Sequence, residues 1–456
     1  MLRLIFLCIL CFISAGPVNC WSTLEPMLIQ RRVFFGEDQR EQLDHIYAIS
    51  NGAGIGGSLF FGMFFDRYGG ASSVFWGAVV TGVGLMLMAL SVSFPGWNWL
   101  LYAAYPITNI GGSMNVYGIY SFLWHFPEHP NLVASLADAV TALSEVIVVT
   151  AVFLHRQYEM PLETFLMALG ILCLSTSFLA FHIVPSMEEV KSCAREAVQE
   201  GRVTSESAIA EVESMGEDND EVEIFRQCID VFQKNIKTNL IFLNYIFLVN
   251  FLLSYVLIQQ FYYYEQLFGA RRATWLVDIF AINFGVSGFL FAVFGGYVCD
   301  EIGIERFLSW MQLMILAFSL LLFCPYESCQ ILSQAQLSLL YDFWDVLVMR
   351  IAMLYAPPHL LGTFSGLLYT VAGVSQMILE PAYDMLSSAF LPQPLPRYWI
   401  SFAMFTLYAI LAGETITRYW KKNSPPTPPL SSSSLPLSLD VEGQGKIIQP
   451  SKSNLP

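Results

Sequence analysis

The chain has 456 residues, of which 55% are apolar and only 13% charged, and its formal net charge is −15. A soluble protein of this length needs far more charge to stay dispersed, so the composition is typical of a membrane protein. Much of the negative charge lies in residues 184–238, which hold 13 Asp and Glu against 6 Lys and Arg. No basic cluster indicates a nucleic-acid partner, and the nine cysteines have no metal-ligand spacing, so we expect neither nucleic acid, metal nor cofactor.

Twelve stretches are long and apolar enough to cross the hydrocarbon core as helices, which takes about 20 residues each. They predict an all-α membrane protein with twelve transmembrane helices in two six-helix halves. The first six are 4–29, 45–65, 72–94, 97–124, 131–154 and 162–184, and the second six are 239–263, 274–298, 306–323, 331–354, 360–386 and 398–417. The tenth is the weakest prediction, because it contains Asp342, Asp345 and Arg350.

These spans divide the chain into four parts. An N-terminal half (1–185) and a C-terminal half (238–418) flank an acidic linker (186–237), whose apolar spacing predicts one or two amphipathic helices. The tail, 419–456, is rich in Pro and Ser and is expected to be disordered. The first 16 residues also fit a secretory signal peptide. Retention is favoured, because helix-compatible sequence continues beyond them and cleavage would leave eleven spans.

One short signature occurs twice, 234 residues apart, directly after the second and the eighth span. In each copy the first glycine permits close helix contact and the last permits a positive φ. The carboxylate between them is favoured at a helix N-terminus. The candidate gating residues are Gly62, Asp66, Arg67 and Gly69 in the first copy and Gly296, Asp300, Gly303 and Arg306 in the second.

Both copies resemble the cytoplasmic loop signature of the major facilitator superfamily. The resemblance implies the major facilitator fold, in which two pseudo-symmetric six-helix halves enclose a central site and work by alternating access. It also implies that both loops face the cytoplasm. We expect Asp66 to meet the start of the eleventh span, around Leu360, in a contact that can latch the two halves in one access state.

A second internal match links the fifth and eleventh spans. Residues 140–147 parallel 371–378 at an offset of 231, which aligns Glu145 with Gln376. Charges at mid-membrane are costly and usually face a cavity or the bundle interior. Asp138, Thr141 and Glu145 share one helix face, which makes them functional candidates. An interhelical structural pair is an equal alternative for each.

Other polar and aromatic side chains occur inside the spans. Pro17 frees a backbone carbonyl in the first span, where an opened helix can bind a zwitterion. Small polar residues in the fourth span and aromatic and amide residues in the seventh suit a cavity wall. Ordinary helix packing is the alternative for any one of them. The candidate substrate-binding residues are Asn19, Trp21, Asn109, Ser113, Asn115, Glu145, Tyr255, Gln259, Asn283 and Gln376.

Within the superfamily the chain resembles the sodium-independent large neutral amino acid transporters and their protist relatives. The matching pieces are Trp21, the loop 66–69, the segments 109–112 and 130–135, and the segment 355–367 before the eleventh span. The resemblance implies a neutral amino acid as substrate. We expect its carboxylate and ammonium groups near Asn19, Ser113, Asn115 and Glu145.

Three alternatives stay open. A proton-coupled carrier of another small organic solute would use Glu145 or Asp138 as the titrating group. A non-transporting receptor or scaffold would act through the acidic linker and the Pro-rich tail. An enzyme fits least, because no nucleophile–base or metal-ligand cluster is recognisable.

The expected partners are therefore a small-molecule substrate and the lipid bilayer, with the plasma membrane as the location. The sequence indicates no oligomeric state. Cys324 and Cys329 bracket a short polar turn and are a candidate disulfide.

Overall fold

The computed structural model of the chain describes residues 1–15, 21–34, 39–199, 221–391 and 393–423. Every regular element in these residues is a helix, so the predicted all-α fold is confirmed. Most of the tail predicted to be disordered lies outside the described residues. The first group of elements is α1 (Leu2–Ser14), α2 (Trp21–Gln30), α3 (Gln39–Gly56), α4 (Ser58–Ser93), η1 (Pro95–Leu100), α5 (Leu101–Tyr120), η2 (Leu123–His125), α6 (Pro130–Tyr158), α7 (Leu162–Thr176), η3 (Ser177–Leu179) and α8 (Ala180–Ile183).

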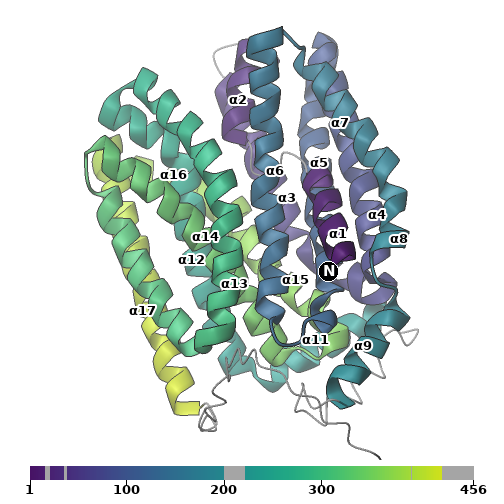
Figure 1. Cartoon of the computed structure of the whole chain (residues 1–456). Coiled ribbons are helices and arrows are strands. Elements are labelled where there is room, and N and C mark those ends of the chain that lie inside the picture. The colour runs from purple at the N-terminus through teal and green to yellow at the C-terminus, as the bar shows by residue number, and fades with distance from the viewer. Residues whose placement is uncertain (16–20, 35–38, 200–220, 392, 424–456) are drawn as a thin grey trace, which may run out of the picture.

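A second group of helices follows the linker and lies beside the first group (Figure 1). The linker helices α9 (Met187–Gln199) and α11 (Glu221–Lys234) lie together at one end of the bundle (Figure 1). The boundaries of the four predicted parts of the chain stay a prediction. The second group is α12 (Ile236–Phe268), α13 (Ala270–Leu322), α14 (Glu327–Tyr355), η4 (Pro358–Leu360), α15 (Leu361–Val374), the π-helical η5 (Ser375–Leu379), α16 (Glu380–Phe390) and α17 (Pro394–Asn423).

Seven helical stretches in the described residues are long and apolar enough to cross a membrane. Two of them, His45–Ser93 and Ala270–Leu322, each cover two predicted spans, so the seven stretches account for nine of the twelve. The first predicted span is split between α1 and α2, with residues 16–20 outside the described part. The fourth and tenth correspond to α5 and α14, which are continuous helices but carry more polar residues.

Both long merged helices turn at the last glycine of the repeated loop. Gly69 interrupts α4 with φ +80° and ψ 169°, and Gly303 interrupts α13 with φ +74° and ψ 163°. An L side chain is disfavoured at such φ values, so both turns need glycine. The positive φ predicted at the two positions is confirmed, and the matched kinks let each helix supply two crossings.

The boundary between the two groups of helices repeats itself. α6 packs along α13, and α15 packs along α3 and α4. The loop signature lies on α4 and α13, while the matched segments 140–147 and 371–378 begin on α6 and α15. Each group therefore packs its helix with the loop signature against the helix of the other group that begins the matched segment.

The opening helix α1 is packed into the bundle. Leu7 and Cys11 are fully buried, and the Cys173 thiol donates to the backbone carbonyl of Ile13 at 3.5 Å. The Asn115 amide on α5 donates to the Ser14 hydroxyl. These contacts place α1 within the packing of the first group of helices.

The linker helices are amphipathic, as the sequence predicts, where the structure describes them. α9 buries Val190 and Ala194, while α11 buries Ile224 and Cys228. Residues 200–220 of the linker lie outside the described part.

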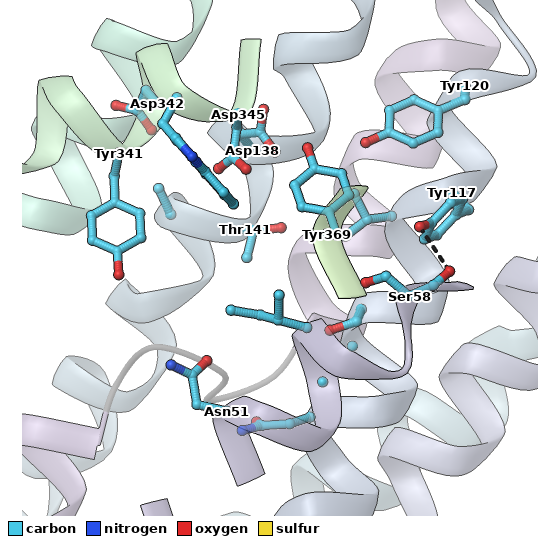
Figure 2. A pocket seen from close by; sticks show the side chains of 18 of the residues that line it. Asn51, Ser58, Tyr117, Tyr120, Asp138, Thr141, Tyr341, Asp342, Asp345 and Tyr369 are labelled. Carbon is cyan, nitrogen blue, oxygen red and sulfur yellow. Dashed lines mark hydrogen bonds between the residues drawn. The ribbon is translucent and has the colours of Figure 1, made fainter. Parts of the chain in front are cut away.

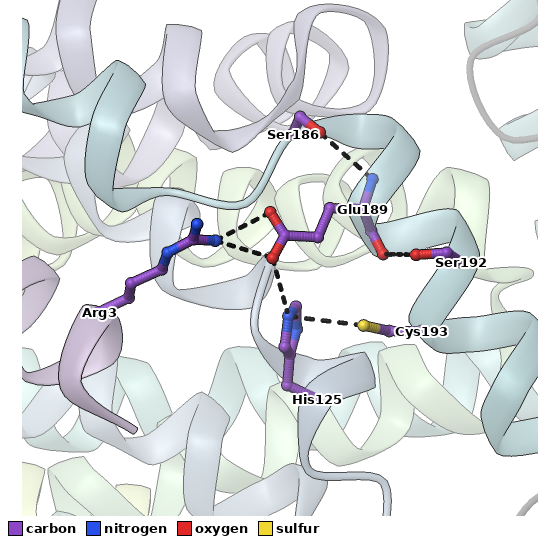
Figure 3. Close-up of polar contacts among 6 residues, drawn as sticks. All are labelled: Arg3, His125, Ser186, Glu189, Ser192 and Cys193. Carbon is purple, nitrogen blue, oxygen red and sulfur yellow. Dashed lines mark hydrogen bonds and ion pairs between the residues drawn. The ribbon is translucent and has the colours of Figure 1, made fainter.

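The start of α9 is held by polar contacts to two other elements (Figure 3). The Ser186 hydroxyl accepts a hydrogen bond from the Glu189 backbone N–H at 3.2 Å, which caps the helix. Arg3 of α1 donates two hydrogen bonds to the Glu189 carboxylate, at 2.7 and 2.9 Å. His125 of η2 lies 3.9 Å from the same carboxylate. The linker is thereby tied to the N-terminal helix group.

Cys324 and Cys329 lie at the turn between α13 and α14. Their sulfur atoms are 2.9 Å apart and are not covalently joined. A disulfide bond is about 2.05 Å long, so only a small movement separates the thiols from the bonded state. Their pairing stays a prediction.

Candidate functional site

A cavity of about 160 Å³ lies between the two groups of helices (Figure 2). Its wall is built from α3, α4, α5 and α6 on one side and from α13, α14 and α15 on the other. Sites for drug-sized ligands occupy roughly 300–1,000 Å³, so this cavity suits a smaller solute.

Three aspartates from both groups share the cavity wall. Asp138 comes from α6, and Asp342 and Asp345 come from α14. Figure 2 draws the three carboxylates together, and the two α14 aspartates are the charged neighbours of Asp138. The Oδ2 atom of Asp138 is buried and has no hydrogen-bond partner. No Lys, Arg or His occurs among the lining residues that the structure describes, so the wall is acidic.

Aromatic side chains make up much of the remaining wall. The Tyr117 hydroxyl donates to the backbone carbonyl of Ser58 at 3.1 Å (Figure 2). The Trp344 ring meets the Tyr369 ring edge-on, with centroids 5.7 Å apart. Tyr120, Phe284 and Tyr341 complete this set. Rings anchored by such contacts keep their position around a small ligand.

Two predicted substrate-binding residues, Asn109 and Ser113, line the cavity from successive turns of α5. Asn109 is fully buried, and neither its amide oxygen nor its amide nitrogen has a hydrogen-bond partner. A Cβ at Gly54 of α3 would lie 3.1 Å from the Ser113 Oγ, so glycine is what lets α3 approach here. A buried amide without a partner costs about 1–3 kcal/mol, which a ligand or water in the cavity can relieve.

Two other predicted residues of the first group lie away from the cavity wall. Trp21 packs against Tyr47 and Tyr105, with ring centroids 5.8 and 4.7 Å away. Asn115 uses its amide to join α5 to Ser14 of α1. The structure assigns both side chains packing contacts, and their part in binding stays a prediction.

Three predicted residues of the second group, Tyr255, Gln259 and Asn283, also lie outside the cavity wall. Tyr255 and Gln259 of α12 each hydrogen-bond to a side chain of α17, at 3.4 Å in both cases. The backbone carbonyl of Asn283 accepts a hydrogen bond from the Ser287 hydroxyl. Asn19, and the side chains of Glu145 and Gln376, lie outside the described residues.

Asp66 joins the two groups at the start of α15. The Gly362 N–H donates to one carboxylate oxygen at 3.0 Å, and the Thr363 N–H and hydroxyl each donate to the other at 2.6 Å. Asp66 thus meets the N-terminus of the eleventh span, as the sequence predicts. A buried carboxylate is stabilised there by unpaired N–H groups and by the helix dipole.

Asp300 makes the equivalent contact with the start of α6. The Leu132 N–H donates to one carboxylate oxygen at 3.1 Å, and the Asn131 N–H donates to the other at 3.4 Å. The side-chain amide of Asn131 donates a further hydrogen bond to this second oxygen. α9 contacts η2, which precedes α6, and α11 contacts α15. Both aspartates therefore lie at the linker end of the bundle.

The first glycine of each loop copy sits in close helix contact. A Cβ at Gly62 would lie 1.9 Å from the Gly362 carbonyl oxygen, and one at Gly296 would lie 2.3 Å from the Ser135 hydroxyl. Close approach at these two positions is what the sequence predicts. Of the two candidate gating arginines, Arg67 has its guanidinium carbon 5.1 Å from the Tyr68 ring centroid, and Arg306 is exposed.

Sequence reasoning missed most of the cavity wall. In the sequence, Asp342 and Asp345 stand out only as charges that weaken a predicted span. Charges inside a membrane helix usually face a cavity, so these two residues carry a signal that points to the cavity wall. The aromatic lining residues had no such signal, since aromatic side chains are common throughout these helices.

Solved structures with the same fold are known. The chain matches the proton:xylose symporter XylE bound to 6-bromo-6-deoxy-D-glucose with a TM-score of 0.66 and 13% identity, over 93% of this chain and 96% of that one. It matches a double tryptophan mutant of XylE with a TM-score of 0.63 and 13% identity, over 92% and 96% of the two chains. It matches a partially occluded inward-open form of the xylose transporter XylE from E. coli with a TM-score of 0.56 and 11% identity, over 94% of this chain and 99% of that one. These likenesses establish the fold.

The sequence itself matches one family model. Residues 5–379 match the model described as Major Facilitator Superfamily, whereas no protein of curated function matches the chain. The predicted count of twelve spans is consistent with that fold. The fold is that of a multi-pass membrane transporter of small solutes and not of an enzyme. The chain belongs to the Major Facilitator Superfamily.

Proposed function

We propose that this chain moves a small solute, a neutral amino acid by resemblance, through the cavity between α3–α6 and α13–α15 by alternating access. The observation that carries the proposal is that residues of both groups of helices line one cavity, while two matched carboxylate contacts join the groups at the linker end. Opening those contacts exposes the cavity to the linker side, and closing them isolates it.

The resemblance to the large neutral amino acid transporters supports an amino acid as the solute. The cavity offers the polar groups of Asn109 and Ser113 for its charged end, with Tyr117 and Trp344 as apolar wall. Asn115, which the sequence also places near the charged groups of the amino acid, uses its amide in a hydrogen bond to Ser14. The plasma membrane is our proposed location.

A proton-coupled carrier is the second candidate, and Asp138 is the observation that favours it. Its carboxylate has a buried oxygen without a partner and lies in the cavity wall. Such a group can exchange a proton as the cavity changes sides. A solved structure with the same fold is described as a proton:xylose symporter.

Transport by purified protein in liposomes tests both candidates. A panel of radiolabelled amino acids, sugars and nucleosides is offered with and without an inward proton gradient. A facilitator of amino acids takes up its solute equally in both conditions, whereas a proton-coupled carrier takes up more with the gradient. A receptor or scaffold moves no solute in counterflow, and that result would refute the proposed function.

A further inference from the structure

We infer that the transported solute is an organic cation, bearing an ammonium or guanidinium group held between α6 and α14 by Asp138, Asp342 and Asp345. This inference rests on the proposed function and changes its substrate class from a neutral to a positively charged solute.

The charge of the cavity wall is the first argument. Three carboxylates from two helices share a small space, and no basic side chain lines it among the described residues. Arg350, the basic residue that follows them on α14, is not among the residues that line the cavity. Carboxylates this close repel one another, so each holds its charge only when a cation is near and otherwise takes up a proton. A bound ammonium or guanidinium group is such a cation.

Asn109 is an independent argument for a ligand. Its side chain is fully buried in the wall, and both of its polar atoms lack a partner. The amide oxygen accepts hydrogen bonds, and ammonium and guanidinium groups are pure donors. The uncovered Oδ2 of Asp138 accepts hydrogen bonds in the same way.

The aromatic residues favour an organic cation over a bare ion. Tyr120, Tyr341, Trp344 and Tyr369 all line the cavity, and the faces of such rings attract cations. The space of about 160 Å³ also exceeds what one ion needs, since a water molecule occupies roughly 30 Å³.

The placement of the aspartates connects cation binding to the transport cycle. Asp138 belongs to the first group of helices, and Asp342 and Asp345 belong to the second. A cation between them attracts both groups, whereas carboxyl groups that have taken up protons do not attract each other in this way. Binding energy is therefore realised when the groups close around the solute.

Matched pairs of solutes test the inference. The full chain in liposomes is offered L-arginine against L-citrulline, and L-lysine against L-norleucine, because each pair differs mainly in charge at similar shape. Agmatine and putrescine test whether the solute needs a carboxylate. We expect uptake of arginine or lysine to exceed that of its neutral partner at least tenfold, or uptake of agmatine or putrescine to exceed that of every neutral solute at least tenfold.

Variants tie the preference to the aspartates. Asp138→Asn and Asp345→Asn should each lower cation uptake at least tenfold. Glu414→Gln changes a surface carboxylate paired with Arg418 and should leave uptake unchanged. Arginine or lysine should also raise the unfolding temperature of the unmodified protein in detergent, and this shift should vanish in Asp345→Asn. The unfolding temperature without solute reports whether each variant is folded.

The outcomes separate the two proposals. Equal or greater uptake of citrulline and norleucine, or full cation uptake by folded aspartate variants, overturns the cation assignment and leaves a transporter. Absence of counterflow for every solute, cationic or neutral, by folded protein overturns the transporter proposal and this inference with it.

Discussion

The carboxylates of Asp66 and Asp300 make the same contact in opposite directions across the boundary between the two groups of helices. Each accepts backbone N–H groups from the second and third residues of a helix in the other group, Gly362 and Thr363 of α15 or Asn131 and Leu132 of α6. Because both contacts lie at the linker end, they close the bundle there in a symmetric way.

Neutralising Asp66 should therefore weaken closure at both contacts. Asp66→Asn replaces a charged acceptor with an amide, and hydrogen bonds to charged groups contribute about 1.5–3 kcal/mol each. A loss of about 2 kcal/mol shifts the closed-to-open ratio roughly 30-fold. Hydrogen–deuterium exchange measures it: peptides at residues 360–366 should exchange faster.

The distant contact reports whether the halves open as rigid bodies. If they do, peptides at residues 130–136 should also exchange faster in Asp66→Asn, although the substitution does not touch them. Thr363→Val removes only the hydroxyl donor and should give a smaller effect of the same kind. Unchanged protection of both segments in Asp66→Asn would contradict a latch.

Gly62 should not accept even a methyl group. The added Cβ would lie 1.9 Å from the Gly362 carbonyl oxygen, so α4 and α15 must separate. Overpacking of this kind costs about 1–3 kcal/mol, and Gly62→Ala should lower the unfolding temperature in detergent. Gly96→Ala is the matched control, because nothing lies within 4 Å of its Cβ. Equal stability of the two variants would argue against the close contact.

The glycines of the repeated loop are predictable from the sequence because their chemistry is local and occurs twice. The glycine turns at Gly69 and Gly303 and the helix-contact glycines each need one residue type at one position. The partner of Asp66 is expected from the resemblance to the family, and the unpaired N–H groups at a helix start explain why a carboxylate is stable there.

The cavity wall is less predictable, because it depends on how the helices rotate about their axes. Asn109 and Asn115 are six residues apart on α5, yet one faces the cavity and the other bonds to α1. A list of polar residues inside spans cannot separate such a pair. Only the crossing of α3, α5 and α1 decides which amide faces the cavity.

This pair of amides gives the third prediction. Asn109→Leu removes an unpartnered buried amide, so the unfolding temperature should stay equal or rise, while solute uptake falls about tenfold or more. Asn115→Leu removes the hydrogen bond to Ser14, so its unfolding temperature should fall. Uptake and thermal unfolding are measured on the same preparations. A destabilised Asn109→Leu with normal uptake would assign Asn109 a packing role.

His125 should make the stability of the linker end depend on pH. It lies outside the membrane spans in η2, and burial lowers its pKa from the ordinary value of about 6.5 despite the opposing effect of Glu189 (Figure 3). The unfolded chain then binds a proton more readily than the folded one, so stability is fully present above about pH 6.5 and is lost as the pH falls. Thermal unfolding between pH 7.5 and 5.0 should show a decrease that is smaller in His125→Gln. His45→Gln, at an exposed position, serves as control and should follow the unmodified protein. An identical pH dependence in His125→Gln would mean that other groups cause the loss.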